Sequence, residues 1–126
     1  MMQIFQHTAC QYQGTVLVGG DLIFNTETSR GVSKIDHNSI WGKFRDTIEK
    51  SDVIFLNYEG VISRGGQPRR NGNQEFLFRS DPAIFSLFRG DRRYILSFAN
   101  NHSFDYGRTA LEECLNLLKT EKIDFI

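Results

Sequence analysis

The sequence predicts an α/β fold with a mainly parallel sheet, and three observations support this prediction. Short apolar runs typical of buried strands occupy residues 15–18, 53–56 and 94–98. Segments with helical apolar spacing lie between or after these runs. Each run ends in residues such as Gly, Asn and Asp that are typical of turns. Strands that alternate with helices form βαβ units, so neighbouring strands run parallel.

The length and composition indicate one globular domain. The chain has 126 residues, of which 40% are hydrophobic and 24% are charged, far from the composition of disordered chains. Fifteen Lys and Arg balance fifteen Asp and Glu, so the net charge gives no reason to expect nucleic acid as a partner. No apolar run approaches the roughly 20 residues of a transmembrane segment, and no signal peptide is visible. We therefore expect the chain as written to stay in the cytoplasm.

The first part of the chain predicts an irregular lead-in, a strand and a helix. Residues 1–13 are polar and patternless, and the strand follows them. Ile40, Phe44 and Ile48 recur every four residues between polar positions. This spacing predicts an amphipathic helix over residues 40–50 that packs on the sheet.

The middle of the chain predicts a surface loop and a short helix. Residues 63–74 are rich in Gly, Arg, Asn and Gln and lack apolar side chains, which is typical of a mobile loop. An extended piece is expected over residues 76–78. Asp81 as N-cap and Pro82 at the first helical position predict a helix that ends near Phe88.

The end of the chain predicts a helix and the beginning of a fourth strand. Leu111, Leu115 and Leu118 form one apolar stripe of a helix over residues 108–119. Residues 123–126 have a strand pattern that stops with the chain. We therefore expect the domain over residues 14–126 to be incomplete, with an exposed apolar face that favours self-association.

Polar side chains follow each of the three predicted strands. They are Asp21 after the first, Asn57 and Glu59 after the second, and Asn100, Asn101 and His102 after the third. Because the carboxyl ends of parallel strands meet at one edge of a sheet, these side chains should lie close together. Carboxylates, amides and an imidazole suit a divalent metal ion. Turn formation explains each of these residues taken singly, but the three sets together favour a site.

Four motifs resemble a known family. They are VGGD at residues 18–21, LNYEG at 56–60, FRSDP at 78–82 and FANNHSFDYG at 98–107. They resemble the bacterial capsule synthesis protein CapA family, which is associated with poly-γ-glutamate synthesis and belongs to the calcineurin-like metallophosphoesterase superfamily. The resemblance runs from about residue 14 to residue 126. It implies the amino-terminal half of a metallophosphoesterase-like αββα sandwich.

The resemblance also implies roles for residues at matching positions. Asp21, Glu59 and Asn101 would hold a divalent metal ion of the manganese, iron, magnesium or zinc type, which could activate a bound water. His102 would act as general acid, because imidazole titrates near neutral pH. Asp105 would fix the orientation of the His102 ring.

Substrate contacts are expected from amides and arginines near this edge. Asn57 and Asn100 lie beside the implied metal ligands, and Arg64, Arg69 and Arg70 lie in the loop after the second strand. A basic loop next to a metal site would suit an anionic polymer such as polyglutamate or a phosphorylated small substrate. A solvated basic surface is the alternative reading of these arginines.

Departures from the superfamily pattern leave two functions open. Ile23 stands where a histidine usually follows the first metal-binding acid, and the histidines of the second half of such domains lie beyond this sequence. We therefore expect weak metal binding, and the site can be empty in a truncated chain. The first function is a metal-dependent hydrolase of a phosphoester or an anionic polymer. The second is a non-catalytic accessory or binding protein that retains the fold, and an unrelated α/β domain is a third, weaker reading.

Overall fold

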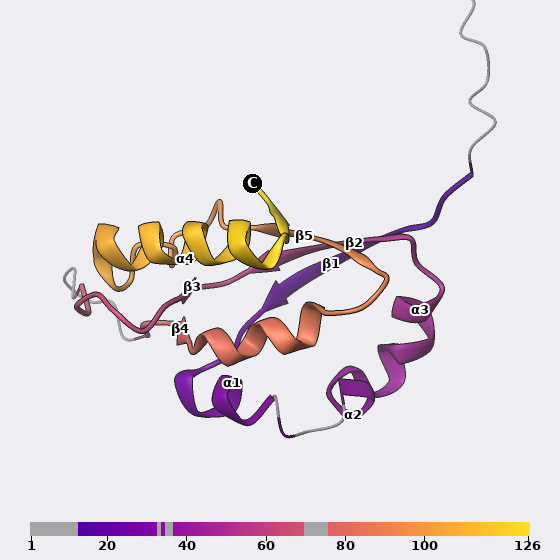
Figure 1. Cartoon of the computed structure of the whole chain (residues 1–126), viewed down its shortest axis with the longest axis horizontal. Coiled ribbons are helices and arrows are strands. Elements are labelled where there is room, and N and C mark those ends of the chain that lie inside the picture. The colour runs from indigo at the N-terminus through magenta and orange to yellow at the C-terminus, as the bar shows by residue number, and fades with distance from the viewer. Residues whose placement is uncertain (1–12, 33, 35–36, 70–75) are drawn as a thin grey trace, which may run out of the picture.

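A parallel sheet forms the centre of the molecule. The computed structural model describes residues 13–32, 34, 37–69 and 76–126. Four parallel strands lie in the order β1-β2-β5-β6 (Figure 1). Their bounds are β1 (Val16–Leu22), β2 (Val53–Tyr58), β5 (Arg93–Ser97) and β6 (Asp124–Phe125). The predicted α/β fold with a mainly parallel sheet is confirmed.

Helices connect the strands, and a small second sheet lies beside them. The helices are α1 (Thr26–Val32), α2 (His37–Trp41), η1 (Gly42–Phe44), α3 (Arg45–Glu49), η2 (Pro82–Phe88) and α4 (Gly107–Glu121). Two short strands, β3 (Val61–Ile62) and β4 (Arg79–Ser80), pair in parallel. Among the described helices, none is long and apolar enough to cross a membrane.

The two faces of the sheet differ in burial. Alternate side chains of β2 are fully or almost fully buried, and they are Ile54, Leu56 and Tyr58. They pack with aromatic residues of η2, where Phe88 meets the Tyr58 ring edge-on at 6.4 Å. On the opposite face Val16 and Val18 of β1 are 60% and 69% exposed. Each main-sheet strand lies beside the one before it, and right-handed connections of this kind place their helices on one face.

Tyr58 connects the main sheet to the two-stranded sheet of β3 and β4, at the carboxyl ends of the main-sheet strands. Its hydroxyl donates to Ser80 Oγ at 2.6 Å, and Ser80 Oγ donates to the carbonyl of Phe24 at 3.0 Å. Burial raises the pKa of Tyr58 far above its usual range, despite the opposing hydrogen bond with Ser80. The ends of β1, β2 and β4 are thus held together by neutral hydroxyl groups.

The prediction of one continuous helix over residues 40–50 is wrong. The backbone breaks into α2, η1 and α3, because Gly42 adopts a positive φ of 51° that ends the first helical turn. Phe44, expected on the buried stripe, is 72% exposed, whereas Ile48 is buried as predicted.

Helix α1 was not predicted, because its sequence is polar. Asn25 caps it by accepting a hydrogen bond from the Thr28 N–H at 2.8 Å. Ser29 is buried on this helix, and its hydroxyl accepts a hydrogen bond from the Asp81 N–H at 2.7 Å. Polar bonds to the start of η2, more than an apolar stripe, therefore position α1.

The other predicted elements lie close to their expected places. The helix after Asp81 is present as η2, but it is a 3₁₀ helix. The predicted extended piece at residues 76–78 is shifted, since strand β4 begins at Arg79. Residues 63–69 contain no helix or strand, as expected of a loop, while residues 70–74 and 1–12 lie outside the described part of the chain.

Cys10 and Cys114 stand alone without Cys-x-x-Cys spacing, so the sequence predicts two free thiols. Cys114 is buried and free. Burial raises its pKa to about 12, although a hydrogen bond from the Ile62 N–H acts in the opposite direction. The prediction for Cys10 falls outside the described residues.

Candidate functional site

The ends of β1 and β2 bring two carboxylates to one amide. Asp21 pairs in register with Asn57 of the neighbouring strand, after an irregularity that follows Val18. Asn57 Nδ2 donates to Asp21 Oδ1 at 2.7 Å and to Glu59 Oε2 at 2.6 Å. The adjacent strands therefore bring together Asp21, Asn57 and Glu59.

Asn100 joins this group from the end of β5. Its Nδ2 donates to Asn57 Oδ1 at 3.1 Å and to the Tyr58 carbonyl at 2.9 Å. Its Oδ1 accepts a hydrogen bond from the His102 N–H at 3.0 Å. Asn100 thus fixes the loop that carries His102 to the end of β2.

His102 lies between two carboxylates. Its Nδ1 is 2.8 Å from Asp105 Oδ2, and its Nε2 is 3.7 Å from Glu59 Oε1. The Asp105 side chain is 1% exposed and also accepts a hydrogen bond from the Phe78 N–H at 2.6 Å. A carboxylate in this position can only accept, so Nδ1 of His102 carries the hydrogen and Nε2 faces Glu59.

His102 Nε2 and Glu59 Oε1 face each other without a direct hydrogen bond. A distance of 3.7 Å is too long for a direct hydrogen bond, but one hydroxyl group can reach both atoms. The His102 and Glu59 side chains are each 13% exposed, so the gap can be reached from solvent. The arrangement can hold and move a proton at His102 Nε2.

Phe78 belongs to this site, and the sequence analysis did not identify it. Its ring lies 4.5 Å from the His102 ring, centroid to centroid, at an interplanar angle of 50°. Next to it the guanidinium group of Arg79 lies over the Tyr106 ring at 4.2 Å. Both residues lie in the FRSDP segment that supported the family resemblance, which was the available signal.

Asn101 makes no described hydrogen bond to the other predicted ligands. Its side chain is exposed, and it lines a largely apolar hollow of about 660 Å³ together with Phe104 and Leu111. Within the described part of the chain, no hydrogen bond joins Asn101 to Asp21 or Glu59. A metal-ligand role for Asn101 stays a prediction.

The described donor set does not fit a divalent metal ion as it stands. Among residues 13–32, 34, 37–69 and 76–126, no group of three or more His, Cys, Asp and Glu side chains could hold one. The NH₂ group of Asn57 lies between the carboxylates of Asp21 and Glu59. Ile23, where the superfamily pattern has a histidine, is 48% exposed and offers no donor atom.

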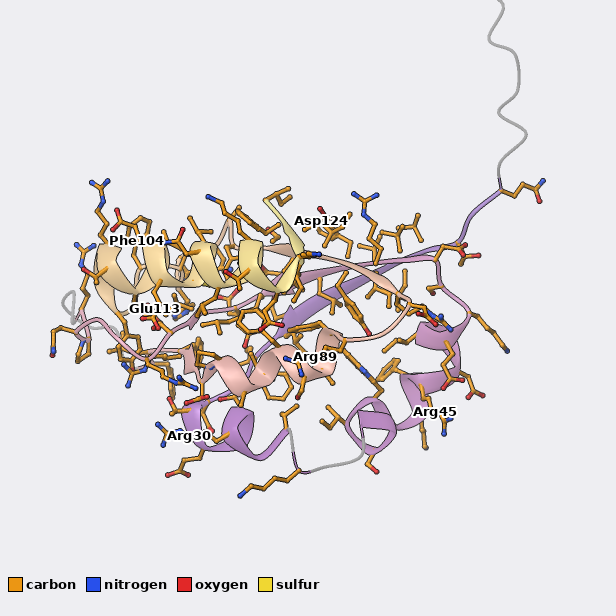
Figure 2. All side chains as sticks on the ribbon, viewed as in Figure 1. Arg30, Arg45, Arg89, Phe104, Glu113 and Asp124 are labelled. Atoms are coloured by element: carbon orange, nitrogen blue, oxygen red, sulfur yellow. The ribbon has the colours of Figure 1, made fainter. Side chains whose placement is uncertain are left out.

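The loop after β3 runs beside the His102 segment. The Arg69 N–H donates to the Asp105 carbonyl at 2.7 Å. At the other end of this loop the Gly65 N–H donates to Glu113 Oε2 at 2.9 Å, and Figure 2 shows Glu113 on the side of α4 that faces β3. The predicted substrate-binding Arg69 thus has its backbone beside the site, and Arg70 lies outside the described residues.

Arg64 shares a carboxylate with a second arginine. Arg30 Nε lies 3.1 Å and Arg64 Nε 3.7 Å from Asp81 Oδ2. Burial opposes ionisation of Asp81, but the Ala83 N–H bond, the Arg30 hydrogen bond and the charges of both arginines hold its pKa below the usual range. Arg64 is 72% exposed, so its guanidinium group still faces solvent.

Comparison with known proteins identifies the family. The family model of the bacterial capsule synthesis protein PGA_cap matches residues 15–126. A search of the curated proteins found none that matches the chain. The match spans nearly all of the chain, including every motif that carried the resemblance. The chain therefore belongs to the bacterial capsule synthesis protein family.

Proposed function

We propose that this chain carries an acid–base site that acts on an anionic polymer or a phosphoester during capsule synthesis, with His102 as the proton donor. Family membership supports the process. The arrangement of His102 between Asp105 and Glu59 is the single observation that carries the reaction type.

The geometry gives each residue a separate task. Asp105 accepts from Nδ1 and so fixes the ring, while Nε2 faces Glu59 Oε1 at 3.7 Å. Protonated Nε2 can give its proton to the leaving oxygen of a phosphoester or the leaving nitrogen of an amide. Glu59 Oε1 can accept a hydrogen bond from the attacking water and take its proton.

The basic loop supports an anionic substrate. Arg64 is exposed, and the backbone of Arg69 is bonded to the segment that carries Asp105. A polymer with repeated carboxylates, such as poly-γ-glutamate, could contact both arginines while one linkage lies against His102.

Two substrates test the proposal. The purified chain is incubated with poly-γ-glutamate and with p-nitrophenyl phosphate, and polymer length and nitrophenolate release are followed. We expect turnover of one of them to fall by about 10²- to 10⁴-fold in His102→Ala, and to be unchanged in Asn116→Ala, which removes an exposed amide from α4. Turnover that is equal in both variants would contradict the role of His102.

A non-catalytic binding protein is the second candidate. It is favoured by Ile23, which is 48% exposed and offers no donor atom where the superfamily pattern has a histidine. In that case poly-γ-glutamate should bind without being cut. Binding should weaken in Arg64→Ala and Arg69→Ala and stay unchanged in His102→Ala.

A further inference from the structure

The amide of Asn57 holds two carboxylates at one point of the site. Its Nδ2 lies 2.7 Å from Asp21 Oδ1 and 2.6 Å from Glu59 Oε2. Ionised carboxylates that face one position repel each other unless positive charge or hydrogen-bond donors lie between them. The NH₂ group supplies such donors, one hydrogen to each carboxylate.

The orientation of this amide follows from backbone groups. The Tyr58 carbonyl can only accept and the His102 N–H can only donate, and both bind Asn100. Asn100 Nδ2 must therefore face Tyr58, and it also faces Asn57. If the Asn57 amide group were rotated by half a turn, its NH₂ group would face the NH₂ group of Asn100, and its oxygen would face two carboxylates. The backbone thus determines that Asn57 donates to Asp21 and Glu59.

No arginine or lysine of the described residues forms an ion pair with Asp21 or Glu59. Among the ion pairs of the described residues, Arg30 and Arg64 pair with Asp81. The described ion pair of Glu59 is the one with His102 Nε2 at 3.7 Å, and no pair of Asp21 is present in that part of the chain. The carboxylate oxygens that face each other therefore depend on the Asn57 amide.

We propose that Asn57 is a positioning residue that takes the place of a cation between Asp21 and Glu59. The two carboxylates are brought together by an internal donor, and a divalent ion can enter only if that donor is removed. This inference concerns the ligand class of the site and holds whether or not His102 catalyses a reaction. Asn57 is then the residue whose side chain prevents this group from binding a metal ion.

Substitution of Asn57 by an acid tests the proposal directly. Asn57→Asp removes the NH₂ group and adds a third carboxylate, a ligand set that hard divalent ions prefer. In titration calorimetry with Mn²⁺, we expect the variant to bind one ion at least about tenfold more tightly than the wild-type chain. The gain should disappear in Asn57→Asp combined with Asp21→Asn. Asn116→Asp is the matched control, because it adds the same charge at an exposed position of α4.

A second variant decides the question if Asn57→Asp does not fold. Asn57→Ala removes the donors without adding charge, so Mn²⁺ should raise its melting temperature but leave that of the wild-type chain unchanged at equal ionic strength. Two results would overturn the proposal. One is saturable binding of one Mn²⁺ by the wild-type chain that is lost in Asp21→Asn. The other is the absence of any gain in both Asn57 variants.

Discussion

Asp105 is the residue on which the orientation of His102 depends. It accepts hydrogen bonds from His102 Nδ1 and from the Phe78 N–H, and its side chain is almost fully buried. Asp105→Asn keeps the size of the side chain but removes the carboxylate charge. We expect the share of His102 that carries its hydrogen on Nδ1 to fall, as measured by the ¹⁵N chemical shifts of the ring, together with turnover.

The same substitution should also affect stability. A buried carboxylate that accepts two hydrogen bonds is replaced by an amide that satisfies them incompletely, so we expect a loss of about 1–3 kcal/mol in urea unfolding. Asp91→Asn, at an exposed position, is the control and should change neither quantity. An unchanged ring tautomer in a folded Asp105→Asn chain would contradict the positioning role.

At the residue scale the sequence predicted part of the site. His102 and Asp105 are three residues apart in one motif, and they contact each other as expected. The role of Asn101 as a metal ligand stays a prediction, because the spacing of neighbouring residues in one loop does not determine which of them faces the site. Phe78 was not identified, although the FRSDP motif contains it, because a motif alone does not show that an aromatic ring will lie against an imidazole.

At the scale of elements, Asp81 stabilises η2 and links it to α1. Its side chain accepts from the Ala83 N–H at 3.0 Å and pairs with Arg30. Asp81→Ala should lower the free energy of unfolding by about 0.5–2 kcal/mol, as expected for a lost N-cap. Asp91→Ala, an exposed acid outside the helices, should have little effect.

The contribution of Asp81 should depend on pH. Its pKa in the folded chain is lower than the ordinary value of 3.8. The stabilisation is therefore fully present above that ordinary value and is lost as the pH falls through the lower, folded-state pKa. In acid unfolding, the difference between wild type and Asp81→Ala should shrink in this range. If the difference in stability between the two chains stays constant over this pH range, the charge of the Asp81 carboxylate does not contribute to stability.

Gly60 permits the close approach of β2, β3 and β4. Its φ is 123°, and a Cβ atom placed there would lie 2.7 Å from Phe78 Cβ and 2.8 Å from the Phe78 carbonyl oxygen. Gly60→Ala should destabilise the fold by more than about 1 kcal/mol. Gly31→Ala in α1 is the matched control, because no atom lies within 4 Å of its added Cβ. That control should be neutral or slightly stabilising, and thermal unfolding of both variants is the measurement.

Element boundaries were predictable where apolar periodicity dominates. The strands near residues 53–58 and 93–97 and helix α4 follow from their side-chain patterns alone. The break at Gly42 was missed because the spacing of Ile40, Phe44 and Ile48 continues across it. Helix α1 was missed because a local N-cap at Asn25 and a tertiary bond from the Asp81 N–H to Ser29 hold it, and neither leaves an apolar period in the sequence.

At the scale of the whole molecule, one face of the sheet remains apolar and partly exposed. Val18, Phe55 and Ile95 lie side by side in register on β1, β2 and β5, and Val18 is 69% exposed. We expect the purified chain to self-associate through this face, because parallel sheets are normally covered on both sides.

Sedimentation velocity can test this expectation. Val18→Lys should shift the distribution toward the monomer, since a charge on the exposed face opposes its burial. Phe44→Lys is the control, because Phe44 is equally exposed but lies in η1 among the helices. If both substitutions act alike, the association does not use the sheet face.

The fold class was predictable from the whole sequence, because three apolar runs and the intervening helices leave few arrangements for a parallel sheet. The order of strands then places Asp21, Asn57 and Asn100 at one edge, as expected. The pairing of their side chains was not predictable. Whether Asn57 donates to the carboxylates or accepts from another group depends on the Tyr58 carbonyl and the His102 N–H.

The strand order has a consequence for how the chain folds during synthesis. In the order β1-β2-β5-β6, each strand of the main sheet lies beside the one made before it. No strand has to insert between two that are already paired. The sheet can therefore grow in one direction as the ribosome releases the chain, because each new strand can pair with the edge of the strand that formed before it. The amide and carboxylates of the site would then meet as soon as β2 has docked on β1, before His102 leaves the ribosome.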